Sequence, residues 1–435
     1  MQFSVMPQSL SAESGILTFA SRRVDELAAK YGTPLIMYDE RVLRGRCRAY
    51  RRAAEANFSA GGAVYYANKA FCCSAMFRLL DEEGMSADVA SGGELYAAAR
   101  AGFPAERICM HGNSKLPGEL ELALDSKIDC ICVDNETELG MLQELCARRG
   151  CIQKITLRIT PCIDIHTHQK INTGGADSKF GIPLLGGIAE AAIKKAAAYS
   201  NLKLYGLQVH LGSQILELEP YLEATRVMLE LLANAQAGGI SGLTDLTLGG
   251  GFGIRYVEGQ EPVDIEAAIT RIGQCVKSEC ARLGIAVPRV NFEPGRSIVG
   301  DAALTLYTAG NVRVNGAGKI YAAVDGGMTD NPRYELYGAP YTVLNASKAK
   351  GTSTQTVTVA GKLCESGDII QENVEIPEVS SGDLVAVLCT GAYNYSMASN
   401  YNRIPRPAVI FIDADGADRL VLRRETDEDM MRLDV

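Results

Sequence analysis

The sequence predicts an α/β protein in which a (β/α)8 barrel is followed by a smaller, mainly β domain. Two observations predict the barrel: a strand-and-helix alternation that repeats eight times from Ala63, and reactive or polar residues at nearly every strand end. After Val299 the helical segments stop, and strand patterns separated by Gly, Asn and Asp turns take over. A chain of 435 residues is too long for one ordinary core, so two domains are expected.

Before the barrel, the chain predicts a short helix near Val24–Lys30 and a strand around Pro34–Tyr38. We expect this strand to join the second domain. Short apolar runs then recur, each followed by a segment long enough for a helix. The expected barrel strands are Val64–Tyr66, Ser86–Val89, Ile108–His111, Cys130–Val133, Ile155–Ile159, Leu204–His210, Leu243–Leu248 and Val290–Phe292.

Two of the intervening helices carry local signals. The last one places Ile265, Ile269, Ile272 and Val276 on one face, because they follow one another at spacings of four, three and four. The helix after the second strand begins with Ser91-Gly92-Gly93-Glu94, which has the spacing of a capping box.

Polar strand ends favour the barrel over a doubly wound open sheet. In a barrel all carboxyl ends of the strands surround one mouth, whereas an open sheet leaves its first and last strands far apart. Residues that end strands at a solvent boundary by chance would explain one or two of these positions, but not all. The strand-end positions that carry this argument are Lys69, Asp88, His111, Asn113, Arg158, His210, Gly249–Gly251, Glu293 and Arg296.

The second domain is expected to contain the N-terminal strand and the region beyond the barrel. We therefore expect the barrel to occupy 40–298, and a β-sandwich or β-barrel-like domain to be formed by 1–39 and 299–435. Its expected later strands are Leu304–Val314, Lys319–Val324, Thr356–Ala360, Leu384–Leu388, Ala408–Ile412 and Arg419–Leu422.

Composition narrows the class of function. A net charge of −9 argues against a nucleic-acid surface, and no apolar run is long enough to cross a bilayer. The thirteen cysteines include no paired C-x-x-C units, and Met1 to Leu17 has no signal-peptide pattern. We therefore expect reduced thiols, a cytoplasmic location and no zinc ribbon.

Lys69 ends the apolar run Val64-Tyr65-Tyr66-Ala67 and is the strongest candidate for covalent chemistry. Burial at such a strand end would disfavour the charged amine and lower its pKa, as a Schiff-base lysine requires. The alternative is a lysine whose stem packs on apolar surface while its ammonium reaches water.

Three further motifs belong to the expected mouth. Gly249-Gly250-Gly251 can bring backbone amides close to an anion such as a phosphate, but the run lacks the dinucleotide-binding spacing. His210 places an imidazole at a strand end, with Ser213 as a further phosphate donor. Glu293-Pro294-Gly295-Arg296 offers a carboxylate that could keep a pyridine nitrogen protonated and an arginine that could pair with a substrate carboxylate.

Two loops complete the candidate chemistry. In the β domain, Cys364 and Glu365 lie in a polar, glycine-bounded loop, so a reactive thiol is plausible, and Arg333 offers a cation for an amino-acid substrate. The connection from Thr160 to Ile182 is long enough to be a functional loop or lid. Its His166-Thr167-His168 pair has no third ligand at a suitable spacing, so no metal is expected.

Together these motifs resemble the fold-type III pyridoxal-phosphate decarboxylases, and among them the diaminopimelate decarboxylase family. The resemblance runs from about residue 30 to about residue 410. The segments that carry it are Tyr66-Ala67-Asn68-Lys69-Ala70, Ser91-Gly92-Gly93-Glu94, His166-Thr167-His168, Ser178-Lys179-Phe180-Gly181, His210-Leu211-Gly212-Ser213-Gln214, Gly249-Gly250-Gly251-Phe252-Gly253, Glu293-Pro294-Gly295-Arg296, Cys364-Glu365-Ser366-Gly367-Asp368, and Gly391-Ala392-Tyr393 to Arg406-Pro407-Ala408.

The resemblance implies an alanine-racemase-like barrel that binds pyridoxal 5'-phosphate, and the conversion of meso-2,6-diaminopimelate to L-lysine and CO2. It assigns Lys69 as the covalent anchor and His210 as the residue that stacks on the cofactor ring. Cys364 would be the acid that reprotonates the substrate carbon. Cofactor contacts are implied for Ser213, Gly251, Glu293, Pro294, Gly295, Arg296 and Tyr393, and substrate contacts for Arg296, Arg333, Tyr337, Glu365 and Tyr393.

In this family Cys364 and Glu365 would reach the site from the second subunit, so the resemblance also implies a homodimer with shared sites. The chain departs from the family pattern at Lys362, where proline is common, and at Asn394 and Tyr395, where a glycine-containing step is usual. These departures concern loop geometry and specificity.

Three alternatives remain open from the sequence. The first is a related decarboxylase that acts on ornithine, arginine or carboxynorspermidine. The second is a racemase with the same two-domain plan, which would need a tyrosine acid and would lack the Cys364 loop. The third is an inactive homologue that regulates a partner enzyme, although such a protein should have lost Lys69 or Cys364.

Overall fold

The computed structural model describes residues 3–163, 175 and 177–435, and the chain divides into two compact units. The barrel unit comprises Arg46–Gly253 and Pro262–Ser297. The β unit comprises Met1–Gly45, Ile254–Glu261 and Ile298–Val435. The functional domain bounds given above stay a prediction.

Eight parallel strands of the barrel unit follow the order β13-β12-β11-β9-β8-β7-β6-β5, and the short strand β10 (Ile182–Pro183) pairs with β9 beside them. The eight are β5 (Tyr65–Ala67), β6 (Ser86–Val89), β7 (Ile108–Met110), β8 (Cys130–Val133), β9 (Gln153–Thr160), β11 (Leu202–Val209), β12 (Asp245–Thr247) and β13 (Arg289–Asn291). Backbone bonds from Tyr65 N–H to Phe292 O (2.8 Å) and from Phe292 N–H to Ala63 O (3.1 Å) join the first strand to the last. The expected (β/α)8 barrel is therefore confirmed.

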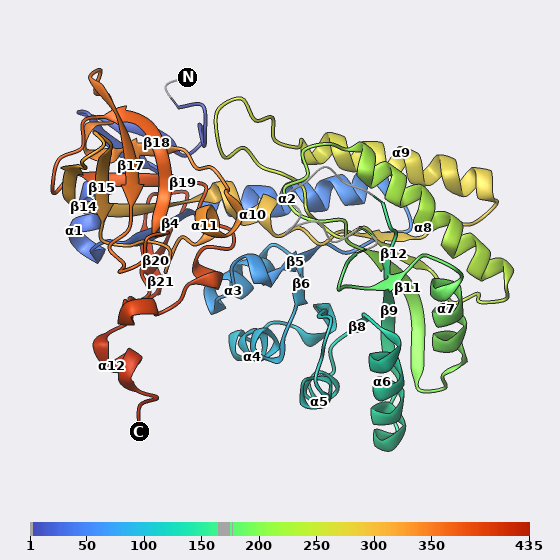
Figure 1. The fold of residues 1–435 in the computed structure, drawn as a ribbon. Coiled ribbons are helices and arrows are strands. Elements are labelled where there is room, and N and C mark those ends of the chain that lie inside the picture. The colour runs from blue at the N-terminus through green and yellow to red at the C-terminus, as the bar shows by residue number, and fades with distance from the viewer. Residues whose placement is uncertain (1–2, 164–174, 176) are drawn as a thin grey trace. The chain divides into compact units, whose positions relative to one another are not determined.

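Helices alternate with these strands and surround them (Figure 1). They are α3 (Ser74–Glu82), α4 (Gly92–Ala101), α5 (Pro117–Asp125), α6 (Glu136–Arg149), α7 (Ile188–Ala198), α8 (Glu219–Ala237) and α9 (Ile265–Leu283). All four residues of the predicted stripe on α9 are buried, which confirms that helix.

Residues 46–57 of α2 (Glu40–Asn57) complete this ring. Asn57 Nδ2 donates to Thr270 Oγ1 on α9 (3.2 Å), and Arg48 forms two bonds with the carboxylate of Glu83 at the end of α3. The sequence did not lead us to expect this helix.

The capping prediction at α4 is half right. The Ser91 hydroxyl accepts from the Glu94 N–H (3.2 Å), as expected. The Glu94 carboxylate, however, accepts from the Ala90 N–H (2.7 Å) instead of closing the box on Ser91.

The β unit contains one large mixed sheet and a small three-stranded sheet. The large sheet has the order β18-β17-β15-β14-β4-β20-β21, with β19 beside β14 and β16 beside β19. Its strands are β4 (Leu35–Asp39), β14 (Ala303–Val314), β15 (Ile320–Val324), β16 (Val343–Asn345), β17 (Thr354–Ala360), β18 (Ile369–Pro377), β19 (Leu384–Leu388), β20 (Ala408–Ile412) and β21 (Asp418–Leu422). The small sheet contains β1 (Leu10–Glu13), β2 (Ile16–Phe19) and β3 (Arg22–Arg23), and the short helices of the unit are α1 (Val24–Tyr31), α11 (Arg333–Tyr337) and α12 (Asp427–Met431). The short helix α10 (Arg296–Val299) begins in the barrel unit and ends in the β unit.

Strand β4 confirms that the N-terminal segment joins this unit, because it pairs antiparallel with β14 and parallel with β20. The core of the unit is built from the buried apolar faces of these strands, including Leu35, Met37, Leu306, Val385 and Ile410. None of the helices in the described part of the chain is long and apolar enough to cross a membrane.

Candidate active site

The carboxyl ends of the barrel strands gather most of the residues that the sequence singled out. Lys69 lies on the 3₁₀ turn η1 (Asn68–Ala70) directly after β5. The Asn68 amide donates to Tyr66 O (3.2 Å) and Asp88 O (3.0 Å), and the Tyr66 hydroxyl donates to Phe71 O (3.0 Å). These bonds fix the turn that presents the lysine.

Lys69 itself is exposed, while Asn68 and Ala70 beside it are buried. The expectation that Lys69 would be buried at this strand end was therefore wrong for the described chain. Its charge acts on Asp88, Glu94 and His210, so the amine lies within electrostatic reach of all three.

A buried acid–imidazole–acid cluster lies at the ends of β6, β7 and β13. His111 Nε2 lies 2.9 Å from Glu293 Oε1 and 3.9 Å from Asp88 Oδ1, and all three side chains are buried. The second oxygen of Glu293 accepts from Gln208 Nε2 on β11 (2.8 Å). Each carboxylate oxygen of Glu293 thus has one fixed donor, which sets the orientation of the group.

The charges in this cluster follow from these contacts. Burial by itself would raise the pKa of Glu293, but the charge and hydrogen bond of His111 and the bond from Gln208 lower it to about 2. Burial opposes the charged form of His111, yet the Asp88 and Glu293 carboxylates raise its pKa well above the usual value. Burial raises the pKa of Asp88, although His111 and Lys69 oppose the shift. Glu293 is therefore an anion with the His111 imidazolium as its partner.

His210 directly follows β11 and is half-buried. Its Nδ1 accepts from the Gly250 N–H (3.4 Å), so the glycine turn holds the imidazole in place. Burial, together with the positive charges of Lys69 and Arg158, lowers the pKa of His210 well below the usual value. The ring is therefore neutral and able to lie against another ring without placing a cation there.

The glycine turn after β12 fits only residues without a side chain. A Cβ on Gly250 would lie 2.1 Å from Glu293 O, and one on Gly251, whose φ is +95°, would lie 2.2 Å from Gly212 O. The turn is thus wedged between the ends of β11 and β13. It brings Gly251 beside the loop that carries Ser213.

Ser213 and Arg296 meet at this point. Arg296 Nε (3.1 Å) and Nη2 (2.8 Å) both donate to Ser213 Oγ. Since the hydroxyl oxygen accepts from the guanidinium, its own hydrogen is directed elsewhere and can serve an anion. Pro294 O accepts from the Ala67 N–H (3.0 Å), and a Cβ on Gly295 would lie 3.2 Å from the Cβ atoms of Ala67 and Ala70. The Pro294-Gly295 turn therefore packs directly against the turn of Lys69.

These residues fit pyridoxal phosphate in each of its three functional parts. Lys69 offers an amine for the aldehyde, Glu293 an anion for the ring nitrogen, and Ser213, Gly251 and Arg296 offer donors for the phosphate. Asn68 Oδ1, Asp88 Oδ1 and Gln208 Oε1 are buried without a hydrogen-bond partner in the described part of the chain, as expected where a polar group binds.

Sequence reasoning missed several contributors at this mouth. His111 and Asp88 were recognised as strand-end residues but not assigned to the site, and Gln208 was not noticed. Glu94 was read only as a cap, yet burial raises its pKa to about 7 in the presence of the Lys69 charge. A polar residue inside an apolar strand, such as Gln208, is the signal that could have found them.

The loop after β9 is described only in part. Thr160 Oγ1 donates to Phe180 O, and the Arg158 guanidinium lies over the Phe180 ring at 4.5 Å from its centroid. This anchors the Ser178-Lys179-Phe180-Gly181 segment at the end of β9. His166 and His168 lie outside the described residues, and no group of three or more His, Cys, Asp and Glu suited to a metal occurs among residues 3–163, 175 and 177–435.

In the β unit, Arg333 begins α11 and is buried between tyrosines. Its guanidinium lies 4.8 Å from the Tyr256 ring centroid and 5.5 Å from that of Tyr341, and Nη1 donates to Tyr341 Oη (2.8 Å). Arg333 Nε is buried and has no partner among the described residues. The arginine therefore retains a donor for an anion such as a substrate carboxylate. Tyr337 ends the same helix and is half-buried.

Tyr393 is half-buried and has a left-handed backbone conformation with φ of +61°. Its electrostatic influence on Arg333 places the two side chains in the same region of the β unit. The unusual Asn394 is fully buried: its Nδ2 donates to Asn331 Oδ1 (2.8 Å), and its Oδ1 accepts from Tyr341 Oη (3.2 Å). Asn394 thus supports the tyrosine that holds Arg333, which gives this departure a structural role. Tyr395 begins the 3₁₀ turn η6 (Tyr395–Met397) and has no comparable explanation.

Asp368 shapes the loop that carries Cys364 and Glu365. Its carboxylate accepts from the Met328 N–H (2.7 Å) and the Leu363 N–H (2.8 Å). Cys364 and Glu365 are exposed, and the Cys364 N–H donates to Asn402 Oδ1 (2.8 Å). The loop is therefore rigid at its base and presents the thiol and the carboxylate to the outside.

Lys362 lies at the start of this loop, and its N–H donates to Gly326 O (3.0 Å). Proline, which is common here in the family that the chain resembles, has no N–H and could not form this bond. The departure replaces a fixed backbone angle by a hydrogen bond.

Comparison with known proteins identifies the family. Residues 43–300 match the family model described as "Pyridoxal-dependent decarboxylase, pyridoxal binding domain". The diaminopimelate decarboxylase of Bacillus subtilis (strain 168) is 46% identical over 411 residues, which cover 94% of this chain and 93% of the relative, and that of Mycobacterium leprae (strain TN) is 39% identical over 442 residues, covering 99% and 93%. The crystal structure of diaminopimelate decarboxylase from M. jannaschii in complex with L-lysine superposes with a TM-score of 0.91 at 31% identity, covering 99% of this chain and 98% of that one. The chain therefore belongs to the pyridoxal-dependent decarboxylase family, among the diaminopimelate decarboxylases.

Proposed function

We propose that this protein decarboxylates meso-2,6-diaminopimelate to L-lysine and CO2 with pyridoxal 5'-phosphate as cofactor, the last step of lysine biosynthesis. Diaminopimelate decarboxylases match the chain over nearly its whole length, and three similar solved structures contain L-lysine. The observation that carries the proposal is the Glu293 carboxylate, which His111 and Gln208 keep ionised at the barrel mouth that also presents Lys69.

Bound pyridoxal phosphate supplies the electron sink that accepts the electron pair left by CO2. Glu293 would face the ring nitrogen and hold its proton, and the neutral His210 ring would lie against the cofactor. Lys69 is the covalent anchor, and Gly251, Ser213, Pro294, Gly295 and Arg296 hold the phosphate end.

The substrate is held by its charged groups. Arg333, with its unpartnered Nε, and Arg296 bind carboxylates, with Tyr337 and Tyr393 beside them. Glu365 faces the distal ammonium or its neighbourhood, and Cys364 Sγ returns a proton to the substrate carbon after CO2 has left.

We also propose a homodimer in which Cys364 and Glu365 of one subunit complete the site of the other. The exposure of both side chains on a loop with a fixed base supports this arrangement. A cytoplasmic location agrees with the thirteen cysteines, all of which are thiols outside any disulfide.

The deciding experiment measures lysine release from meso-diaminopimelate by the purified protein with added pyridoxal phosphate, with ornithine and arginine as competing substrates. Lysine formed from diaminopimelate, without amine release from the other two, is the expected result. A yellow protein that decarboxylates only another basic amino acid would support the proposed cofactor and contradict the proposed substrate. A colourless, inert protein would contradict the proposal and favour a regulatory homologue.

A further inference from the structure

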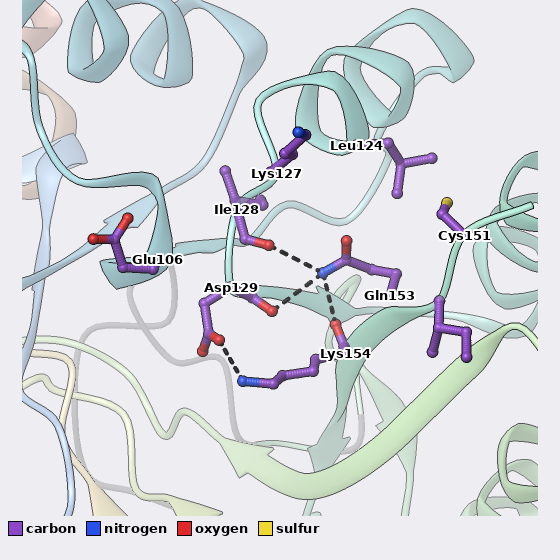
Figure 2. A pocket seen from close by; sticks show the side chains of 9 residues that line it. Glu106, Leu124, Lys127, Ile128, Asp129, Cys151, Gln153 and Lys154 are labelled. Atoms are coloured by element: carbon purple, nitrogen blue, oxygen red, sulfur yellow. Dashed lines mark hydrogen bonds and ion pairs between the residues drawn. The ribbon is translucent and has the colours of Figure 1, made fainter. Parts of the chain in front are cut away.

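A pocket of about 310 Å³ lies at the amino ends of β7, β8 and β9, whereas the candidate active site lies at the carboxyl ends of the barrel strands (Figure 2). Three loops form it: the turn before β7 with Glu106, the α5–β8 connection with Lys127 and Asp129, and the α6–β9 connection with Ile152. Its size is at the lower end of the range for small-molecule sites.

Gln153 provides the feature that distinguishes this pocket from an ordinary surface hollow. The residue is 6% exposed, and its Nε2 donates to three backbone carbonyls, those of Ile128 (3.4 Å), Asp129 (3.2 Å) and Lys154 (3.1 Å). Because only the amino group can donate, these carbonyls fix which way the amide faces. Figure 2 shows its oxygen pointing away from them, toward the region between Lys127 and Leu124. No residue in the described part of the chain hydrogen-bonds that oxygen, so an acceptor on a largely buried side chain faces the pocket.

Charged groups of both signs accompany this acceptor. Lys154 Nζ donates to Asp129 Oδ1 (2.6 Å), so these two partly neutralise each other. Lys127 and Glu106 have no ion-pair partner among the described residues. A simple anion such as phosphate would meet two carboxylates here, and a simple cation two ammonium groups. A ligand that carries one charge of each sign matches the lining.

Lys127 is also held in an unusual conformation. Its φ is +54°, at the end of α5, in the left-handed region where glycine is the usual residue. Glycine would adopt this backbone conformation without strain, so the backbone does not explain a lysine at this position. What lysine provides here is its side chain. The remaining lining is aliphatic, with Leu124, Ile128 and Ile152.

We propose that this pocket binds a small aliphatic α-amino acid as its zwitterion. The α-ammonium donates to Gln153 Oε1, the α-carboxylate pairs with Lys127, and the side chain lies against the aliphatic residues. The binding does not depend on the decarboxylase activity proposed above.

The test is a titration of the pyridoxal-phosphate-loaded protein with L-leucine, followed by the methyl NMR signals of labelled Leu and Ile residues. Two analogues each lack one charge: leucine amide has no carboxylate and 4-methylpentanoate has no ammonium. Lys127→Gly removes the cation while giving the backbone its preferred residue, so its thermal stability should be unchanged or slightly higher. Lys277→Ala, on the exposed face of α9, is the matched control.

We expect saturable shifts at Ile128, Ile152 and Leu124 below about 10 mM leucine, and at least about a tenfold weaker response with either analogue or with Lys127→Gly. Lys277→Ala should bind as the unaltered protein does. Absence of shifts at these methyl groups, or shifts that Lys127→Gly leaves unchanged, would overturn the proposal. Leucine that reaches the cofactor instead would change the cofactor absorbance, which separates the two sites.

Discussion

The Nε2 of His111 lies 2.9 Å from Oε1 of Glu293, and both side chains are buried at the carboxyl ends of barrel strands β7 and β13. Asp88 Oδ1 lies 3.9 Å from the same nitrogen. One imidazolium therefore offsets two carboxylates in a region from which water is largely excluded. Removing it leaves buried charge without a partner.

We expect His111→Leu to destabilise the protein by about 3–5 kcal/mol, the cost typical of breaking one side of a buried ion pair. The variant should also bind pyridoxal phosphate more weakly, because Glu293 or Asp88 must then take up a proton. Thermal unfolding and cofactor titration measure the two effects.

His111→Gln is the control, because its amide keeps a donor toward Glu293 without the charge. It should recover part of the stability but not the cofactor affinity. If both variants bind the cofactor as tightly as the unaltered protein, His111 has no role in holding Glu293 ionised.

Glu293 predicts a specific acid sensitivity. Its pKa is lowered from 4.5 to about 2 in the folded protein, so its contribution to stability is present above pH 4.5 and is lost as the pH falls toward 2. The contribution of His111 to stability depends on pH in the opposite direction. Because the pKa of His111 is raised in the folded protein, its contribution is fully present below pH 6.5 and is lost only when the pH rises through the higher folded pKa. Between these two pH limits, both Glu293 and His111 are therefore charged in the folded protein.

Glu293→Gln should flatten the loss of stability on the acid side. The measurement is the urea midpoint between about pH 5.5 and pH 3.5, compared between this variant and the unaltered protein. Equal slopes would show that Glu293 does not titrate as its contacts indicate.

Lys69 is predicted to be the only covalent anchor of the cofactor. Lys69→Ala should bind pyridoxal phosphate without a borohydride-reducible chromophore and should lose all measurable turnover. Lys203→Ala, an exposed lysine at the start of β11, is the control and should be reduced normally. A reducible chromophore in Lys69→Ala would assign the anchor to another amine.

The barrel could be predicted because its strands are short, apolar and separated by regular intervals. Ser86–Val89 and Cys130–Val133 have the expected bounds, and the other six differ at their ends by one or two residues. Helix α2 was missed although Leu43, Cys47, Tyr50 and Ala54 are buried at the same four-three-four spacing as the stripe on α9. Five arginines between Leu43 and Ala54 concealed the pattern, because their charges lower the mean hydropathy of the segment.

Strand β18 was missed for a different reason. Gln371, Glu372 and Asn373 interrupt its apolar pattern, and Asn373 has a φ of +53° where the register with β17 shifts. A bulge breaks the alternation on which strand prediction depends. In the same way, a sequence shows that Lys69 follows a strand but not that the next turn leaves the residue exposed.

The loop of Cys364 predicts a difference between two substitutions at Lys362. Lys362→Pro removes the N–H that donates to Gly326 O, so the loop base should shift at a cost of about 1 kcal/mol. Turnover should fall while the cofactor binds normally. Lys362→Ala keeps the backbone bond and should behave as the unaltered protein does; a similar fall in both variants would show that the lysine side chain matters instead.

Cys364 is predicted to act on the substrate of the other subunit. Cys364→Ala should bind cofactor normally and lose about 10²–10⁴-fold in turnover, the range typical of a general acid, whereas Cys275→Ala, a half-buried thiol on α9, should not. Mixing Cys364→Ala with Lys69→Ala tests the sharing of sites directly. Subunit exchange makes half of the dimers mixed, and each mixed dimer contains one site with both residues intact, so activity should return to about a quarter of the unaltered level. If instead each site used residues of one subunit only, no mixture of the two variants could assemble an intact site, and activity would stay at the sum of the two inactive proteins.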